Sequence, residues 1–63
     1  MTKQFEEIKI GDQVMQPRYK NGVVVQKEVK GKHSHVRVRF EEVKGGWYEK
    51  KYTLSQIPQL NFI

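Results

Sequence analysis

The clearest alternation of hydrophobic and polar residues lies at residues 35–40, which read His-Val-Arg-Val-Arg-Phe. Successive side chains of a β-strand point to opposite faces, so this alternation predicts a strand with one buried face. The apolar residues of the strand are expected in the core, and they are Val36, Val38 and Phe40. The basic residues then form an outward-facing row of His35, Arg37 and Arg39.

Two further strands precede this one. Residues 12–17 predict a strand that ends at Pro17, because proline has no backbone N–H to donate to a sheet. An excursion follows at residues 18–22, and its last two residues, Asn21-Gly22, are expected to supply the positive φ that turns the chain back.

Residues 23–29 predict the next strand, which begins with three consecutive valines. Three valines in a row interrupt the alternation, and a bulge near Val24-Val25 would restore it. Residues 30–33 read as the hairpin connection to residues 35–40, with Gly31 at the position that favours glycine.

The end of the chain predicts two more strands. Residues 47–52 follow a loop at 41–46 and form a fourth strand. One of its faces carries Trp47, Glu49 and Lys51, and the other carries Tyr48, Lys50 and Tyr52. Residues 53–56 suit a single 3-10 turn, and residues 57–60 a short closing strand in which Pro58 requires an edge position.

Five short strands separated by turn signals predict an all-β fold, a small five-stranded barrel over residues 10–61. Residues 1–9 are expected to be an arm that lays Phe5 or Ile8 against one end of the barrel, and residues 62–63 a short tail. The pattern leaves open whether the apolar residues near the two ends are core or interface: Phe5, Phe62 and Ile63.

Composition narrows the class of protein. The 63 residues form one domain at most, and a chain of this size buries only about 60% of its unfolded surface. There is no cysteine, no apolar stretch of membrane-spanning length and no secretion signal, so a cytoplasmic protein without a membrane partner is expected. The net charge is +5, and residues 18–39 hold seven basic residues against one acid. Such a local positive field attracts phosphates or acidic protein surfaces.

The motifs Gly11-Asp12-x-Val14, Pro17 and Gly22-x-Val24-Val25 resemble those of SH3-like or Tudor-like barrels. Within that group the chain is similar to the C-terminal Tudor-like domain of UvrD/PcrA-type helicases and to the RNA-polymerase-interacting domain of CarD-like factors. The resemblance covers roughly residues 8–60. It implies an SH3-like barrel with a short 3-10 turn before the last strand, and it implies RNA polymerase as the kind of partner.

The basic residues of the middle of the chain are the first candidate site. They are Arg18, Lys20, Lys27, Lys30, Lys32, His35, Arg37 and Arg39. On adjacent strands they would form one patch for phosphate or carboxylate groups, for which arginine offers bidentate geometry. The alternative is a solvated face that keeps a small protein soluble.

Aromatic residues form the second candidate. In SH3-like barrels the excursion and the loop before the fourth strand meet, which would bring Tyr19 near Trp47 or Tyr48, beside Arg18 and Lys20. Aromatic rings beside basic groups suit base stacking or an extended peptide. The alternative is that Trp47 and a tyrosine close the barrel ends, and for Tyr52 this core role is favoured.

Catalysis and metal binding find little support in the sequence. His33-Ser34-His35 lacks a third ligand for zinc, and Ser34 and Ser55 lack a base with an orienting group. Type II dihydrofolate reductases are also tiny SH3-like barrels, but their active-site Val-Gln-Ile-Tyr corresponds here to residues 48–52, Tyr-Glu-Lys-Lys-Tyr. No cofactor is therefore expected.

The sequence thus favours a small non-enzymatic binding module, a bacterial or phage-type regulator. Its expected partner is RNA polymerase or another acidic protein surface, with DNA or RNA as a further possibility. The basic face, with Arg37, Arg39 and Lys27, would supply electrostatic attraction, and Tyr19 and Trp47 would supply specific contacts. The alternative function is a peptide-binding adaptor or a subunit-interface protein, and the chain is expected to be a monomer or a weak homodimer.

Overall fold

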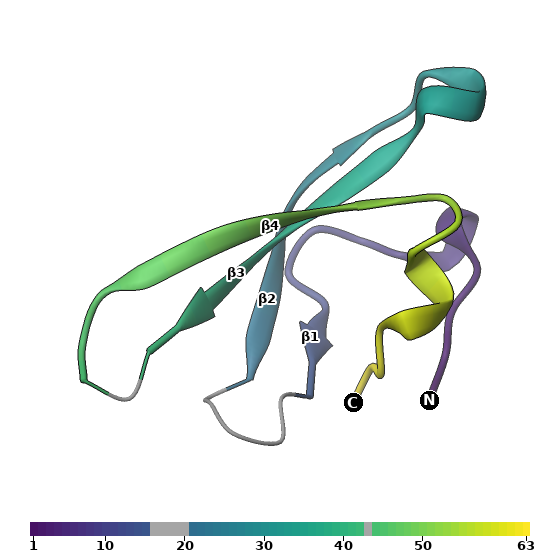
Figure 1. Cartoon of the computed structure of the whole chain (residues 1–63). Coiled ribbons are helices and arrows are strands. Elements are labelled where there is room, and N and C mark those ends of the chain that lie inside the picture. The colour runs from purple at the N-terminus through teal and green to yellow at the C-terminus, as the bar shows by residue number, and fades with distance from the viewer. Residues whose placement is uncertain (16–20, 43) are drawn as a thin grey trace.

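The structure is a computed structural model that describes residues 1–15, 21–42 and 44–63. Arg18, Tyr19 and Lys20 lie outside the described residues, so their expected meeting with Trp47 stays a prediction. The described part of the chain forms one antiparallel sheet in the order β1-β2-β3-β4 (Figure 1). Its strands are β1 (Gln13–Val14), β2 (Gly22–Glu28), β3 (His35–Glu41) and β4 (Trp47–Thr53). The expected all-β class is confirmed.

Three short 3-10 helices complete the described elements: η1 (Phe5–Glu7), η2 (Gly31–His33) and η3 (Ile57–Gln59). Each is a single turn, and none of the helices in the described ranges has the length and apolar character that a membrane crossing requires. The second helix forms the tip of the β2–β3 hairpin, where Gly31 has a φ of 56°. The expectation that glycine occupies the demanding position of this turn is confirmed.

The expected bulge in β2 is confirmed. Val24 lies opposite Val38, but the next opposed pair is Gln26 with Arg37, so Val25 has no residue opposite it. An extra residue in one strand reverses which side chains face inward beyond it. Val24 therefore faces the core, and two positions past the bulge Lys27 faces the same side, opposite Val36.

The C-terminal segment differs from the expectation. Residues 57–60 were expected as a closing strand, but Ile57–Gln59 form η3, and the 3-10 turn expected at 53–56 is a hydrogen-bonded turn from Thr53 to Gln56. Proline explains the change, because Pro58 stands in the first turn of η3, where its fixed φ is suitable and its missing N–H has no partner to lose.

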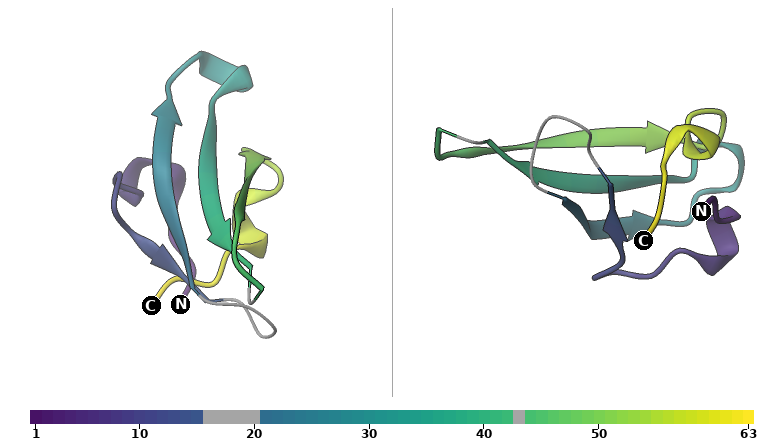
Figure 2. Two further views of the ribbon diagram at one scale, coloured as in Figure 1. Left: turned by 90° about the vertical axis from the view of Figure 1, so that its left-hand side faces the viewer. Right: turned by 90° about the horizontal axis from the view of Figure 1, so that it is seen from below.

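The last residues of the chain pair with β1. Val14 forms an isolated antiparallel bridge with Phe62, Met15 N donates to Asn61 O at 2.7 Å, and Ile63 N donates to Gln13 O at 3.1 Å. Phe62 N also donates to Met1 O, so the two termini lie side by side (Figure 2). Phe62 is buried, which assigns it to the core, whereas Ile63 is exposed.

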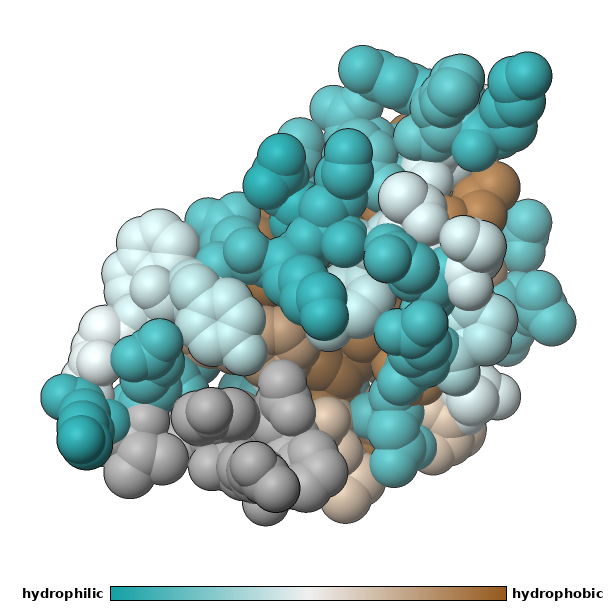
Figure 3. All heavy atoms as spheres, in the orientation of Figure 1, coloured by the Kyte–Doolittle hydropathy of each residue, from teal (hydrophilic) through white to brown (hydrophobic). Residues whose placement is uncertain are grey.

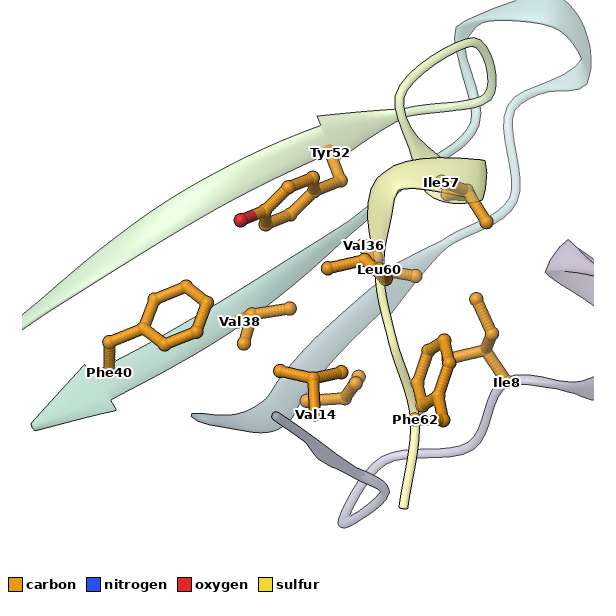
Figure 4. Close-up of a cluster of buried hydrophobic side chains, with 10 residues drawn as sticks. Ile8, Val14, Val36, Val38, Phe40, Tyr52, Ile57, Leu60 and Phe62 are labelled. Atoms are coloured by element: carbon orange, nitrogen blue, oxygen red, sulfur yellow. The ribbon is translucent and has the colours of Figure 1, made fainter. Parts of the chain in front are cut away.

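The core lies between the inner face of the sheet and the segments that cross it (Figure 4). It consists of Ile8, Val14, Val24, Val36, Val38, Phe40, Tyr52, Ile57, Leu60 and Phe62. The alternation of β3 is confirmed, because its three apolar residues are all buried here. The arm also behaves as expected, since Ile8 is fully buried and Phe5 packs against the cluster.

Gly22 has a different role from the one its sequence suggests. Gly22 does not have the positive φ that was expected of the Asn21-Gly22 pair. Gly22 is buried, and an added Cβ would lie 2.5 Å from Cε1 of Phe40 and 2.8 Å from Cγ1 of Val38. The glycine is therefore required because the core side chains of β3 pack directly against its backbone.

A charged turn leads into β1. The Asp12 carboxylate accepts a hydrogen bond from Lys9 N at 2.8 Å and forms an ion pair with Lys3 Nζ at 3.0 Å. The backbone donor, with a further contribution from the Lys3 ammonium, holds the pKa of Asp12 below its ordinary value of 3.8. The arm and the first strand are thus connected by a carboxylate that the fold keeps ionised.

Candidate functional site

We define the outer face as the side of the sheet that carries His35, Arg37 and Arg39. Directly opposed residues of an antiparallel sheet point to the same side. The cross-strand partners on β4 are therefore outer-face residues too: Thr53, Lys51 and Glu49. Those on β2 are Glu28, Gln26 and Val23. The final pair of the β3–β4 hairpin, Glu41 with Trp47, continues the same side.

Trp47 and Arg39 form the most distinctive contact on this face. The guanidinium carbon of Arg39 lies 4.2 Å from the centre of the Trp47 ring, and the Trp47 side chain is 53% exposed. Val23 lies opposite Arg39 on β2 and is also exposed. We call these three residues the Trp47 cluster. An exposed tryptophan held by an arginine presents apolar area and hydrogen-bond donors in one place.

Charge on the outer face is balanced. The basic side chains Arg37, Arg39 and Lys51 share it with the acids Glu28, Glu41 and Glu49. Arg39 lies opposite Glu49, and His35 lies opposite Glu28. The row of basic residues on β3 is as expected, but the strands also supply acids beside it, so the described strand residues of this face hold as many acids as arginines and lysines.

Lys27 does not belong to this face, and the expectation that it joins Arg37 and Arg39 is wrong. Its ammonium donates to Ile8 O at 2.9 Å and lies 4.8 Å from the centre of the Phe5 ring. The bulge at Val25 is the cause, because it shifts Lys27 to the inner side of β2. Lys27 therefore fastens the N-terminal arm to the end of the core.

Lys30 and Lys32 lie at the turn formed by η2, whereas Trp47 begins β4 at the other end of the sheet (Figure 1). Lys30 is salt-bridged to Glu28 at 3.3 Å, and Lys32 is exposed. These two lysines are thus separate from the Trp47 cluster. Of the predicted site residues, the structure gathers His35, Arg37, Arg39 and Trp47 on one face.

The two tyrosines of β4 face inward, on the side opposite to Trp47. The ring of Tyr48 is tilted by 33° against Phe40, with the ring centres 5.4 Å apart. Tyr52 is buried in the core, as expected, and this burial, with a contribution from Tyr48, raises the pKa of its hydroxyl above the ordinary 10.0. Trp47 and Tyr48 therefore cannot act in one cluster.

A groove of about 410 Å³ lies on the inner side, beside the segment that follows η3. Its apolar floor appears as the brown surface at the centre of Figure 3. The lining residues are Val14, Met15, Asn21, Phe40, Tyr52, Gln59, Leu60 and Asn61. The sequence did not indicate this groove, because its shape depends on the path of residues 57–60, which were expected to form a strand but include η3.

Val23 is the member of the Trp47 cluster that sequence reasoning missed. The signal was present in the three consecutive valines, because a bulge at Val25 leaves Val24 in the core and Val23 on the outer face.

Comparison with protein families, with curated proteins and with solved structures finds no match for this chain. Arguments about its function therefore depend on the geometry of its own residues.

Proposed function

We propose that this chain is a non-enzymatic binding module, an SH3-like barrel whose outer face docks on a protein surface through the Trp47 cluster. The observation that carries the proposal is the exposed Trp47 ring with the Arg39 guanidinium over it. RNA polymerase is the first partner to test, because the resemblance to CarD-like and helicase Tudor-like domains implies it. The chain would then act as a small regulator of transcription.

The proposed barrel is supported by the path of the chain after β4. That strand is one edge of the sheet, and the C-terminal residues return through η3 to pair with β1, the other edge. A chain that runs in this way from the end of one edge strand to pair with the other supports a small, partly open barrel. The 3-10 helix η3 comes shortly before this last pairing segment.

A protein partner fits the outer face better than nucleic acid does. Affinity for nucleic acid comes mainly from basic residues that neutralise phosphates, and on this face acids balance the basic residues. Tryptophan and arginine are the residues that most often dominate protein interfaces. The Arg39 guanidinium beside the ring also carries N–H donors that suit a carboxylate of the partner.

The inner groove supports a second candidate, the peptide-binding adaptor. Its apolar lining and polar rim suit an extended peptide with alternating side chains. Substitutions can test the two candidate functions separately, because Trp47 lies on the outer face and Leu60 lines the groove.

A pull-down with purified RNA polymerase tests the first candidate. We expect the wild-type chain to be retained, and Trp47→Ala and Arg39→Ala each to weaken retention by roughly tenfold or more, as central interface residues do. Lys32→Ala is the matched control, because it removes a positive charge at the distant η2 turn. Equal loss for Lys32→Ala and Arg39→Ala would mean that net charge, rather than the Trp47 cluster, carries the binding.

An electrophoretic titration against duplex and single-stranded DNA at two salt concentrations tests the other partner class. We expect weak binding that disappears at the higher salt, since acids match the arginines and lysines among the described strand residues of the outer face. Tight, salt-dependent binding that Arg37→Ala and Arg39→Ala abolish would assign the face to nucleic acid instead of protein.

A further inference from the structure

The two edges of the sheet are treated differently. At the β1 edge only two residues form the strand, and the C-terminal residues pair with them on the side away from β2. At the other edge β4 extends over seven residues (Figure 1). Within the described ranges, no backbone group forms a ladder with the side of β4 away from β3. An open strand edge is a template for pairing with another strand.

β4 lacks most of the devices that protect an edge strand. It contains no proline, and its register with β3 runs without a shift from Thr53 to Trp47. The open part of this edge runs from Trp47 to Tyr52, because at Thr53 the backbone N–H donates to Gln56 Oε1 at 3.0 Å and the carbonyl accepts from Gln56 N at 2.9 Å. Its two lysines, Lys50 and Lys51, are the remaining protection, and they repel a partner only if that partner brings no acid opposite them.

The sequence of β4 is complementary to itself when it is read against a second, antiparallel copy. With Lys50 opposite its own counterpart, Glu49 lies opposite Lys51 of the second copy, and Lys51 opposite Glu49. In the same register, Tyr48 of each copy lies opposite Tyr52 of the other copy. Opposite charges and aromatic pairs in directly opposed positions stabilise antiparallel strands.

We propose that two copies of this chain associate through their β4 edges, antiparallel, around a twofold axis at Lys50. Such an axis must be perpendicular to the sheet, so inner-face residues oppose inner-face residues, and the neighbouring allowed registers centre on Glu49 or Lys51. The register centred on Glu49 places the two Glu49 side chains opposite each other. The register centred on Lys51 does the same with the two Lys51 side chains, and neither register forms a Glu–Lys pair between the copies.

The pair of Lys50 residues at the axis is a tolerable feature of this register. The Lys50 ammonium lies 5.2 Å from the centre of the Tyr52 ring in its own chain. Tyr52 is two residues further along the strand, so this contact draws the ammonium away from the axis. The two like charges are therefore kept apart by contacts that already exist in each copy.

The dimer would present two Trp47 clusters on one continuous outer face. Trp47 of one copy lies opposite Thr53 of the other, so the two tryptophans are six residues apart along the strands, about 20 Å. Two sites at a fixed separation bind a partner with two matching sites more tightly than either alone. The association itself does not depend on the proposed partner, so each proposal fails independently of the other.

Sedimentation equilibrium of charge-swap variants tests the pairing. We expect the wild-type chain to dimerise between micromolar and millimolar concentrations, and Glu49→Lys or Lys51→Glu to raise the dimer dissociation constant by about tenfold or more, because each creates two like-charge pairs. The double variant Glu49→Lys with Lys51→Glu should restore dimerisation. Glu6→Lys on η1 is the matched control and should leave it unchanged.

Disulfide trapping provides a second test, since the described chain has no free cysteine and the full sequence contains none. Lys50→Cys should oxidise to a covalent dimer at low protein concentration, because the twofold axis brings the two residue-50 positions together. Lys32→Cys should not. A wild-type chain that stays monomeric at millimolar concentration, a double variant that fails to restore dimerisation, or equal trapping of both cysteine variants would overturn the proposal.

Discussion

The two faces of β3 come from one strand of seven residues and yet have opposite roles. On the inner face, its apolar residues Val36, Val38 and Phe40 are buried. On the outer face, Arg39 is exposed and lies against Trp47. The difference indicates that stability and recognition are separable in this small domain. Substitutions on the inner face should change the free energy of unfolding, and substitutions on the outer face should change binding.

The largest expected effect is on the inner face. Phe40→Ala removes a buried ring that contacts Tyr48 and fills the space above Gly22. Such truncations cost about 3–5 kcal/mol, which is comparable with the whole stability of many small domains. Urea denaturation followed by circular dichroism should show a largely unfolded chain. Arg39→Ala, one position away, should stay within about 0.5 kcal/mol of wild type, and equal losses for the two would contradict the separation.

Gly22→Ala has the next largest expected effect on the free energy of unfolding. One added methyl group would lie 2.5 Å from the Phe40 ring, so the core side chains must shift. Overpacking of this kind costs about 1–3 kcal/mol. The same urea experiment measures the loss. Gly45→Ala is not a fair control because Gly45 has a φ of 90°, so Val25→Ala at the exposed bulge position serves instead.

Lys27 provides a further test of the difference between the two faces, because it is basic and yet lies on the inner side. Lys27→Ala removes the hydrogen bond to Ile8 O and the contact with Phe5, at a cost of about 1 kcal/mol. Binding of the folded variant to RNA polymerase should equal that of wild type. Arg39→Ala should show the reverse pattern. A loss of binding by folded Lys27→Ala would return Lys27 to the binding face.

The smallest effect is the pH dependence from Asp12. Its pKa is below the ordinary 3.8 in the folded chain, so its ionised form stabilises the fold at neutral pH. That contribution is lost as the pH falls through the folded pKa. Asp12→Asn should therefore be less stable than wild type at pH 7, and the difference in unfolding free energy should close below about pH 3.8. A difference that persists unchanged at low pH would show that the charge is not its origin.

The strand β3 was predictable because its apolar and basic residues alternate with period two, and β2 because three consecutive valines favour a strand once a bulge restores the alternation. The β3 hydrophobic row, the bulge at Val25 and the burial of Tyr52 are all confirmed. Each depends on local sequence alone. Pattern was also sufficient to place Arg37 and Arg39 together on the face opposite the core.

The remaining features depend on contacts between distant residues. Gly22 is required by the ring of Phe40, which is eighteen positions further along the chain. The charge balance of the outer face follows from the β3–β4 register, which places Glu49 opposite Arg39. The role of Pro58 was misjudged because a proline suits both an edge strand and the first turn of a 3-10 helix. At each of these positions the local sequence is compatible with more than one structure, and contacts with distant residues determine which one forms.

The most direct measurement of the central claim uses the single tryptophan of the chain. The chain is labelled with 5-fluorotryptophan and observed by fluorine NMR while unlabelled RNA polymerase is added. The account predicts that the resonance of Trp47 shifts or broadens as its exposed ring is covered, and that folded Lys27→Ala behaves in the same way. A resonance that stays unchanged while the chain is shown to bind, or a failure of the chain to bind at all, would contradict the account.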